Sequence, residues 1–372
     1  MHWAKLTRMS KHVLVAGASG VVGFSALRLF SSTADCKITA ISRKAPLETG
    51  RARYLSVDLA DASACAALAN DLSDVTHLVY AALHEEPTLV AGWLEANQIE
   101  TNATMLRNLF EPIAARARNL EHVTLLQGTK AYGAHVQPIE IPAREDRSEL
   151  RAQANFYWLQ ENYLRKKQRG ESWSWTILRP QIVFGGAIGA AMNLLPAIGA
   201  WAALRKEQGL GLPFPGGANT VLEAVDADLL AQAIAWAGEA PAARNQIFNV
   251  TNGDVFVWRN VWPAIADALG LKPAAPAPES LANTLGKEDA TIAWDTIRTR
   301  HGLRAPALRE FLGRSDQYAD FCFGYGLEGS GAAIVSTIKL RRAGFHDVVD
   351  TEEMFRRWFK WFQENHLLPS RN

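Results

Sequence analysis

The stretch His12-Val13-Leu14-Val15-Ala16-Gly17-Ala18-Ser19-Gly20-Val21-Val22-Gly23 decides the fold of this chain. Its first residues form an apolar run that is typical of a buried strand, and the residues that follow Gly20 predict a helix from Val21 to Phe30. Glycines at the spacing GxxGxxG lie between them, where backbone amides and a helix N-terminus can approach a pyrophosphate. A strand, a glycine-rich turn and a helix in this order predict the start of a dinucleotide-binding Rossmann fold.

Strand and helix signals alternate through the rest of the first half. This alternation is typical of a parallel sheet with helices on both faces, so we expect an α/β fold with a doubly wound Rossmann sheet. Strands are expected at 37–41, 53–57, 76–80, 122–126 and 174–178, and helices at 62–72, 94–118 and 156–168.

The second half has a looser pattern and predicts mainly helices. We expect a Rossmann domain for NADP over 1–190 and a smaller, mainly helical substrate-binding cap over 191–372, with a strand at 246–250 returning to the sheet. The mildly basic residues 1–10 lack the apolar stretch of a signal peptide and are expected to form a leader, with Met9 as a second candidate start. Helices are expected at 194–206, 226–236, 258–269 and 352–365.

Composition excludes several classes of partner. The net charge of +1 gives no electrostatic reason to expect nucleic acid or an anionic membrane. Cys36, Cys65 and Cys322 show neither a CxxC pair nor the spacing of metal ligands, which favours a reducing, cytoplasmic location and predicts no metal site. The uncharged stretch 182–204 is long enough to span a bilayer, but its glycines and proline favour a buried core or pocket wall.

The end of the second strand indicates the preferred cofactor. Ser42-Arg43-Lys44 stands where a site for NAD usually carries an acidic residue, and an arginine there suits the 2′-phosphate of NADP. The alternative is a pair of solvated basic residues. Asp58 is expected either to contact the adenine or to cap a helix, and Ala81 and Ala82 are small enough for a cofactor to pass closely.

Two tyrosines compete for the catalytic role on the helix 156–168. Short-chain dehydrogenases use Tyr-x-x-x-Lys, in which the lysine lowers the pKa of the phenol. Tyr157 has Glu161 in place of that lysine, whereas Tyr163 has Lys167 but lies in a charged stretch, so we interpret the second pair as a chance match on a solvated face. Lys130, after the fifth strand, is expected to direct its ammonium at Tyr157, with a surface lysine as the alternative.

These motifs resemble the progesterone 5β-reductase and iridoid synthase family, an atypical group of extended short-chain dehydrogenases. That family has a Lys-x-Tyr segment and an Asn-Phe-Tyr-Tyr-x-x-Glu-Asp segment, which appear here as Lys130-Ala131-Tyr132 and Asn155-Phe156-Tyr157-Trp158-Leu159-Gln160-Glu161-Asn162. The resemblance extends well over 13–269 and weakly beyond. Trp158 departs from the pattern, and so does Gly133-Ala134-His135-Val136, which replaces a pocket stretch with a proline and a phenylalanine.

The resemblance implies an NADPH-dependent 1,4-reduction of an enone or enal, with an enolate stabilised by Tyr157 and Lys130. It implies a small apolar carbonyl substrate near Tyr132, Val136, Met192 and Leu195, of which the last two have plain core packing as the alternative. The residues expected to bind the cofactor are Gly17, Ser19, Gly20, Val21, Val22, Gly23, Ser42, Arg43, Lys44, Asp58, Leu59, Ala81, Ala82, Gln127, Gly128, Thr129, Lys130, Tyr157, Pro180, Ile182 and Val183.

Two other functions remain open at this point. One is a carbonyl reductase or nucleotide-sugar epimerase of the extended short-chain dehydrogenase type, which the glutamate at position 161 disfavours. The other is an NADP-sensing protein without catalysis, which the presence of both Lys130 and Tyr157 disfavours. The apolar C-terminal helix is expected to cover either the chain's own pocket or the interface of a homodimer.

Overall fold

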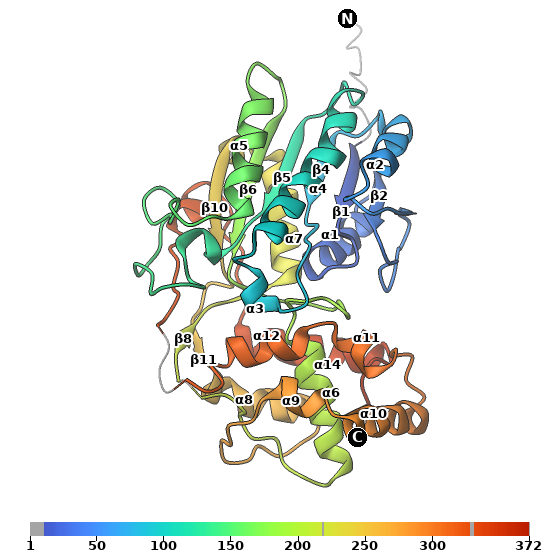
Figure 1. The fold of residues 1–372 in the computed structure, drawn as a ribbon, viewed down its shortest axis with the longest axis vertical. Coiled ribbons are helices and arrows are strands. Elements are labelled where there is room, and N and C mark those ends of the chain that lie inside the picture. The colour runs from blue at the N-terminus through green and yellow to red at the C-terminus, as the bar shows by residue number, and fades with distance from the viewer. Residues whose placement is uncertain (1–10, 218, 328–330, 372) are drawn as a thin grey trace, which may run out of the picture.

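The computed structural model describes residues 11–217, 219–327 and 331–371, so the leader expected at 1–10 lies outside the described residues. A seven-stranded parallel sheet forms its centre, in the order β10-β6-β5-β4-β1-β2-β3 (Figure 1). This is the doubly wound order of the predicted Rossmann fold. The strands are β1 (Lys11–Ala16), β2 (Cys36–Ser42), β3 (Arg53–Ser56), β4 (His77–Tyr80), β5 (His122–Leu126), β6 (Ser174–Pro180) and β10 (Gln246–Val250).

Helices cover both faces of the sheet because successive side chains of a strand point to opposite faces. On β1, Val13 and Val15 belong to one buried cluster, and Leu14 and Ala16 belong to another. The helices α1 (Val21–Ser32) and α7 (Ala227–Glu239) pack together over the first cluster, and the second is covered by α2 (Ala62–Leu68), α4 (Ala96–Ala114) and α5 (Phe156–Gln168). Short helices α3 (Leu89–Gly92), η1 (Ala69–Leu72), η2 (Thr129–Tyr132) and η3 (Pro241–Ala243) occur in the connections.

A second, mainly helical part lies beyond the carboxyl ends of the strands, at the bottom of Figure 1. The strand expected to return to the sheet does so as β10, and α7, which falls in the expected cap, also packs with the sheet. The helical part contains α6 (Leu195–Glu207), α8 (Trp258–Ala268), α9 (Leu281–Leu285), α10 (Glu288–His301), α11 (Leu308–Leu312), α12 (Ser315–Cys322) and α14 (Thr351–Glu364). The remaining elements are α13 (Ile338–Arg342) and the strand pairs β7 (Ile182–Phe184) with β9 (Ala224–Asp226) and β8 (Val221–Leu222) with β11 (Phe256–Val257).

The C-terminal helix α14 buries its apolar face inside its own chain. Met354, Phe355, Trp358, Phe359 and Phe362 are fully buried, and α14 packs against α8 and α6. This face therefore covers neither the cavity described below nor a dimer interface, because the chain's own core already occupies it.

The uncharged stretch 182–204 divides into β7, an irregular segment and the buried helix α6. The helix α6 belongs to the buried core and the residues before it line the cavity, as the sequence predicted for this stretch. Among the residues described, no helix has the length and apolar character needed to cross a membrane.

Candidate active site

The turn between β1 and α1 brings three backbone segments into close contact. Gly17 has a φ of +85°, and a Cβ there would lie 2.6 Å from the backbone nitrogen of Ala82. A Cβ on Gly23 would lie 2.2 Å from the carbonyl oxygen of Gly17, so this glycine lets helix and turn pack closely. The first turn of α1 carries no acidic residue, which leaves its N-terminal amides available to an anion.

A cavity of about 1810 Å³ follows this turn along the carboxyl edge of the sheet and extends toward α12. It exceeds the usual volume of a small-molecule pocket, so it has room for a dinucleotide and a second molecule. Every residue predicted to bind the cofactor lines the cavity except Gly23. Gly23 instead makes the helix contact described above. Within the described part of the chain, no group of three or more His, Cys, Asp and Glu residues could hold a metal ion.

The end of β2 presents basic groups to this cavity. Arg43 is exposed, and no hydrogen bond or ion pair of its guanidinium occurs among the described residues. Lys44 lies 3.6 Å from Glu310 of the helical part, and both side chains are largely exposed. Asp58 lines the cavity and accepts a hydrogen bond from the backbone nitrogen of Ala60. The expected role as a helix cap is wrong, because Asp61 caps α2.

Tyr157 lies in the first turn of α5, with its hydroxyl at the carboxyl end of the sheet. Asn155 begins the helix by accepting a hydrogen bond from the backbone nitrogen of Tyr157 at 3.0 Å. A Cβ on Gly128 would lie 3.3 Å from the Tyr157 hydroxyl, so the absence of a side chain there makes room for the phenol. Burial, helped by the charge of Glu85, raises the pKa of Tyr157 well above its usual value. The phenol is therefore a neutral hydrogen-bond donor at neutral pH.

Glu161, which replaces the lysine of ordinary short-chain dehydrogenases, pairs with three arginines, of which Arg179 is buried. Its carboxylate contacts Arg151 at 2.8 Å, Arg165 at 3.0 Å and Arg179 at 3.6 Å. Burial alone would raise the pKa of Glu161, but the hydrogen bond and charge of Arg151, together with the other arginines, lower it overall. Glu161 thus stays ionised and supplies no positive charge to Tyr157.

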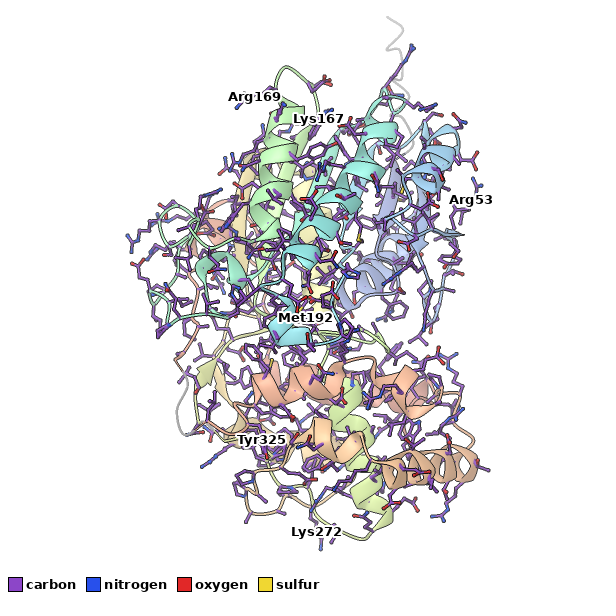
Figure 2. The ribbon with its side chains drawn as sticks, in the orientation of Figure 1. Arg53, Lys167, Arg169, Met192, Lys272 and Tyr325 are labelled. Atoms are coloured by element: carbon purple, nitrogen blue, oxygen red, sulfur yellow. The ribbon has the colours of Figure 1, made fainter. Side chains whose placement is uncertain are left out.

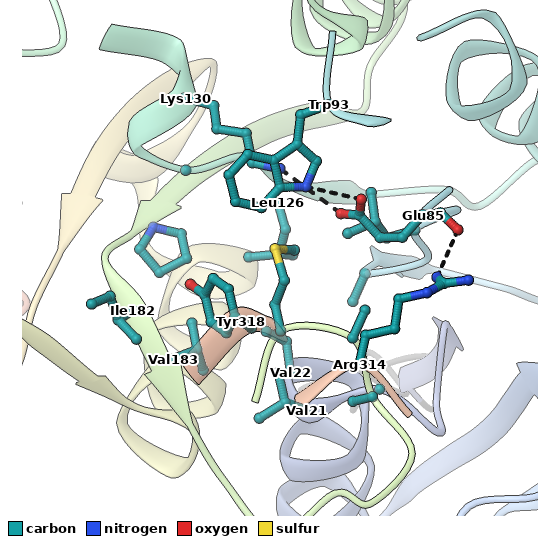
Figure 3. A pocket seen from close by; sticks show the side chains of 18 of the residues that line it. Val21, Val22, Glu85, Trp93, Leu126, Lys130, Ile182, Val183, Arg314 and Tyr318 are labelled. Atoms are coloured by element: carbon teal, nitrogen blue, oxygen red, sulfur yellow. Dashed lines mark hydrogen bonds and ion pairs between the residues drawn. The ribbon is translucent and has the colours of Figure 1, made fainter. Parts of the chain in front are cut away.

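The ammonium of Lys130 lies over the ring of Trp93 rather than on the phenol of Tyr157. Its Nζ is 3.7 Å from the centre of that ring and 3.8 Å from Oε1 of Glu85 (Figure 3). We expected the ammonium to be directed at Tyr157. Among the described residues Lys130 makes no hydrogen bond to Tyr157, and its ammonium lies beside Glu85 and Trp93 instead. The reason is electrostatic, because a buried carboxylate and an aromatic face both attract a cation. Burial lowers the pKa of Lys130 to about 8, although Glu85 raises it.

The sequence reasoning missed Glu85 and Trp93, which both line the cavity. Oε2 of Glu85 accepts hydrogen bonds from Nε1 of Trp93 at 3.0 Å and from Nε2 of Gln98 at 2.8 Å. Arg314 of the helical part donates to the backbone oxygen of Glu85 at 2.9 Å (Figure 3). The available signal was an acidic side chain shortly after a buried parallel strand, at the sheet edge where ligands bind.

The competing pair Tyr163 and Lys167 lies outside the cavity. The ring of Tyr163 packs edge-on against Phe110 at 6.0 Å, and Lys167 donates to Glu111 at 2.7 Å. Lys167 belongs to the last turn of α5, at the end of the sheet remote from Met192 (Figure 2). Neither residue lines the cavity, which agrees with a chance match, although Tyr163 is half-buried rather than on a solvated face.

The four residues expected near the substrate divide equally. Val136 and Met192 line the cavity, whereas Leu195 is fully buried in the core. Tyr132 is also buried outside the cavity, because its hydroxyl donates to Asn249 and accepts from Arg179. We therefore correct the assignment of Tyr132 and Leu195 to the substrate site. The helical part contributes residues that the sequence did not indicate, namely Arg314, Gln317, Tyr318, Phe321 and Cys322.

The sequence of this chain matches a known protein family over most of its length. Residues 58–318 match the family described as the PRISE-like Rossmann-fold domain. The (S)-8-oxocitronellyl enol synthase of Catharanthus roseus is 29% identical over 83% of this chain and 81% of its own length. The 3-oxo-Delta(4,5)-steroid 5-beta-reductase of Arabidopsis thaliana is 32% identical over 70% of this chain and 69% of its own length.

Solved structures show the fold at lower identity. The enzyme WbmH of Bordetella bronchiseptica, solved in complex with NAD+, superposes with a TM-score of 0.65 and 15% identity, over 96% of this chain and 99% of the other. Such a likeness establishes the Rossmann architecture alone. The match over most of the chain and the similarity to both plant enzymes show that this chain is an oxidoreductase enzyme of the PRISE-like Rossmann-fold family.

Proposed function

We propose that this enzyme uses NADPH to reduce the carbon–carbon double bond of an enone or enal. The names of its relatives, an enol synthase and a 3-oxo-Delta(4,5)-steroid 5-beta-reductase, are consistent with chemistry at a conjugated carbonyl.

The cavity residues fit a phosphorylated dinucleotide. The amides at the start of α1 face no acidic side chain of their own turn and can bind a pyrophosphate. Arg43 offers a guanidinium that no described carboxylate neutralises, at the position where a 2′-phosphate would lie. Close packing of Gly17 against Ala81 and Ala82 keeps side chains out of the path of the cofactor.

The state of Tyr157 is the observation that carries the proposed reaction. In a Tyr-x-x-x-Lys site the lysine lowers the pKa of the phenol, which suits a proton transfer to a carbonyl oxygen. Here that position is Glu161, and burial raises the pKa of Tyr157. A phenol that holds its proton is a good hydrogen-bond donor to an enolate and a poor acid.

The reaction then needs mainly fixed donors from the chain. Bound NADPH would supply hydride for the β-carbon of the substrate, and negative charge would collect on the carbonyl oxygen. Tyr157 and the ammonium of Lys130 would stabilise this oxygen, and one well-placed donor in a dry site contributes about 3 kcal/mol. The enolate would then take its proton at the α-carbon from water.

An apolar substrate suits the walls of the cavity near these groups. Trp93 and Phe321 meet edge to face at 5.2 Å and both line the cavity. Phe156, Val90 and Met192 also line it. These side chains would hold an apolar carbonyl compound while the polar donors bind its oxygen.

The test compares Tyr157→Phe with Tyr163→Phe, using NADPH and a cyclic enone. We expect Tyr157→Phe to lower kcat by about 100-fold, because one donor to the enolate is lost, while the Kd of NADPH stays nearly constant. Tyr163→Phe is the matched control on the same helix, because Tyr163 does not line the cavity, and we expect full activity. If Tyr163→Phe is the variant that loses activity, the proposed site is wrong.

A further inference from the structure

Two buried polar atoms of opposite charge face each other in the cavity wall without a hydrogen bond. Among the described residues, neither Oε1 of Glu85 nor Nζ of Lys130 has a hydrogen-bond partner, and the two atoms are 3.8 Å apart. Their side chains are only 4% and 12% exposed, so water does not screen the pair as it would a surface ion pair. A buried arrangement of this kind persists only when each charge stabilises the other.

The hydrogen bonds around Glu85 fix its carboxyl group beside Lys130. Its Oε2 accepts from both Trp93 and Gln98. Burial raises the pKa of Glu85, and the charge of Lys130 and these two hydrogen bonds oppose that rise. Gln98 is fully buried on α4 and its own Oε1 accepts from the backbone nitrogen of Glu86 at 2.8 Å. Arg314 holds the backbone of Glu85 from the helical part. The carboxylate is therefore fixed before any substrate enters.

We propose that Glu85 is a positioning residue that keeps Lys130 protonated and holds its ammonium over Trp93 in the wall of the reaction cavity. This inference rests on the proposed function and adds a residue to it. Without the carboxylate, the amine would lie on an aromatic ring in a buried site, where the neutral form is favoured. A neutral amine is a weak donor to an enolate, so loss of Glu85 would weaken Lys130 without removing it.

Three described groups near Lys130 keep one charge state between pH 6.5 and 9. His135, on the segment after η2, is neutral in this range because burial, followed by the charge of Lys130, lowers its pKa to about 4. Tyr157 on α5 and Tyr318 on α12 keep their protons because burial raises the pKa of both. A titration in this range therefore reports on Lys130 together with Glu85.

The direct test measures the pKa of Lys130 in the ligand-free protein by NMR of 15N- and 13C-labelled lysine. Its signal is identified by its loss in Lys130→Arg. We expect a pKa near 8 in the wild type and a decrease of about one unit or more in Glu85→Gln. Glu85→Asp should keep part of the effect, and Glu86→Gln is the control because Glu86 contacts Asn97 and His84 rather than Lys130. An unchanged pKa in Glu85→Gln would overturn the proposal.

The pH profile of enone reduction gives a second readout. We expect the alkaline limb of kcat to move to lower pH in Glu85→Gln, so that activity falls about tenfold at pH 8.5 and much less at pH 6.5. A loss that is equal at every pH would indicate a purely structural role and contradict the proposal. If the NMR shift occurs but wild-type protein reduces no enone, the proposed function fails while the pairing of Glu85 with Lys130 stands.

Discussion

Two neighbouring positions on one turn of α5 show how single residues set the chemistry. Tyr157 and Glu161 are four residues apart, so their side chains lie on the same face of the helix. The glutamate pairs with arginines from three segments, whereas the tyrosine faces the cavity in a site that raises its pKa. This face of α5 therefore carries a neutral donor, Tyr157, and a carboxylate in a charge cluster, Glu161, where short-chain dehydrogenases carry a tyrosine and a lysine.

This separation predicts a large stability effect at Glu161. Its substitution by glutamine would leave the buried guanidinium of Arg179 with less compensation, and breaking such a pair costs about 3–5 kcal/mol in the free energy of unfolding. Arg179 keeps Glu149 at 2.6 Å, so the low end of this range is expected. Urea unfolding measures the change, with Glu111→Gln as the control. Glu111 pairs with Lys167 on the surface, and such a pair contributes only about 0–1 kcal/mol to the free energy of unfolding. Equal losses in both variants would contradict the buried role of Glu161.

At the scale of elements, the carboxyl ends of neighbouring strands assemble the site. β1 supplies the glycine turn, β2 the basic residues, β4 the segment leading to Glu85, and β5 the segment leading to Lys130. All four strands are parallel neighbours, so their ends meet at one edge of the sheet. The alternation of strands and helices was enough to predict this edge.

The end of β2 predicts the preference for NADPH. In Arg43→Ala we expect the KM for NADPH to rise about tenfold or more, because a charge-assisted hydrogen bond to the 2′-phosphate would be lost. The KM for NADH should hardly change. Arg53→Ala is the control, since Arg53 on β3 pairs with Asp71 and lies outside the cavity (Figure 2). An equal effect of Arg43→Ala on both cofactors would argue against a 2′-phosphate site.

At the scale of the whole molecule, the sequence predicted the sheet better than the helical part. Strand and helix periodicities are local, so the elements from β1 to β6 fall close to their expected positions. The helix expected at 94–118 forms as α4, which is shorter at both ends because Glu95 is extended and precedes it, and the short helix α3 before it was not expected. The return of β10 to the sheet was expected, whereas the packing of α7 with the sheet was not.

The unpredicted parts of the site depend on contacts between distant segments. Tyr132 sits beside Lys130 in sequence but turns away from the cavity, since Asn249 on β10 and Arg179 on β6 bind its hydroxyl. Lys130 meets Glu85 of the β4–α3 connection and Trp93 at the end of α3. Neither pairing has a signal in local spacing, and both decide which groups line the cavity.

The most direct test of the central claim is the position of deuterium after reduction of a cyclic enone with NADPH deuterated at C4 of the nicotinamide. Tyr157 keeps its proton and Lys130 is cationic near neutral pH, so both would stabilise an enolate. The account predicts deuterium on the β-carbon of a product that retains its carbonyl group. Deuterium on a newly formed alcohol carbon would contradict it and identify the enzyme as a carbonyl reductase.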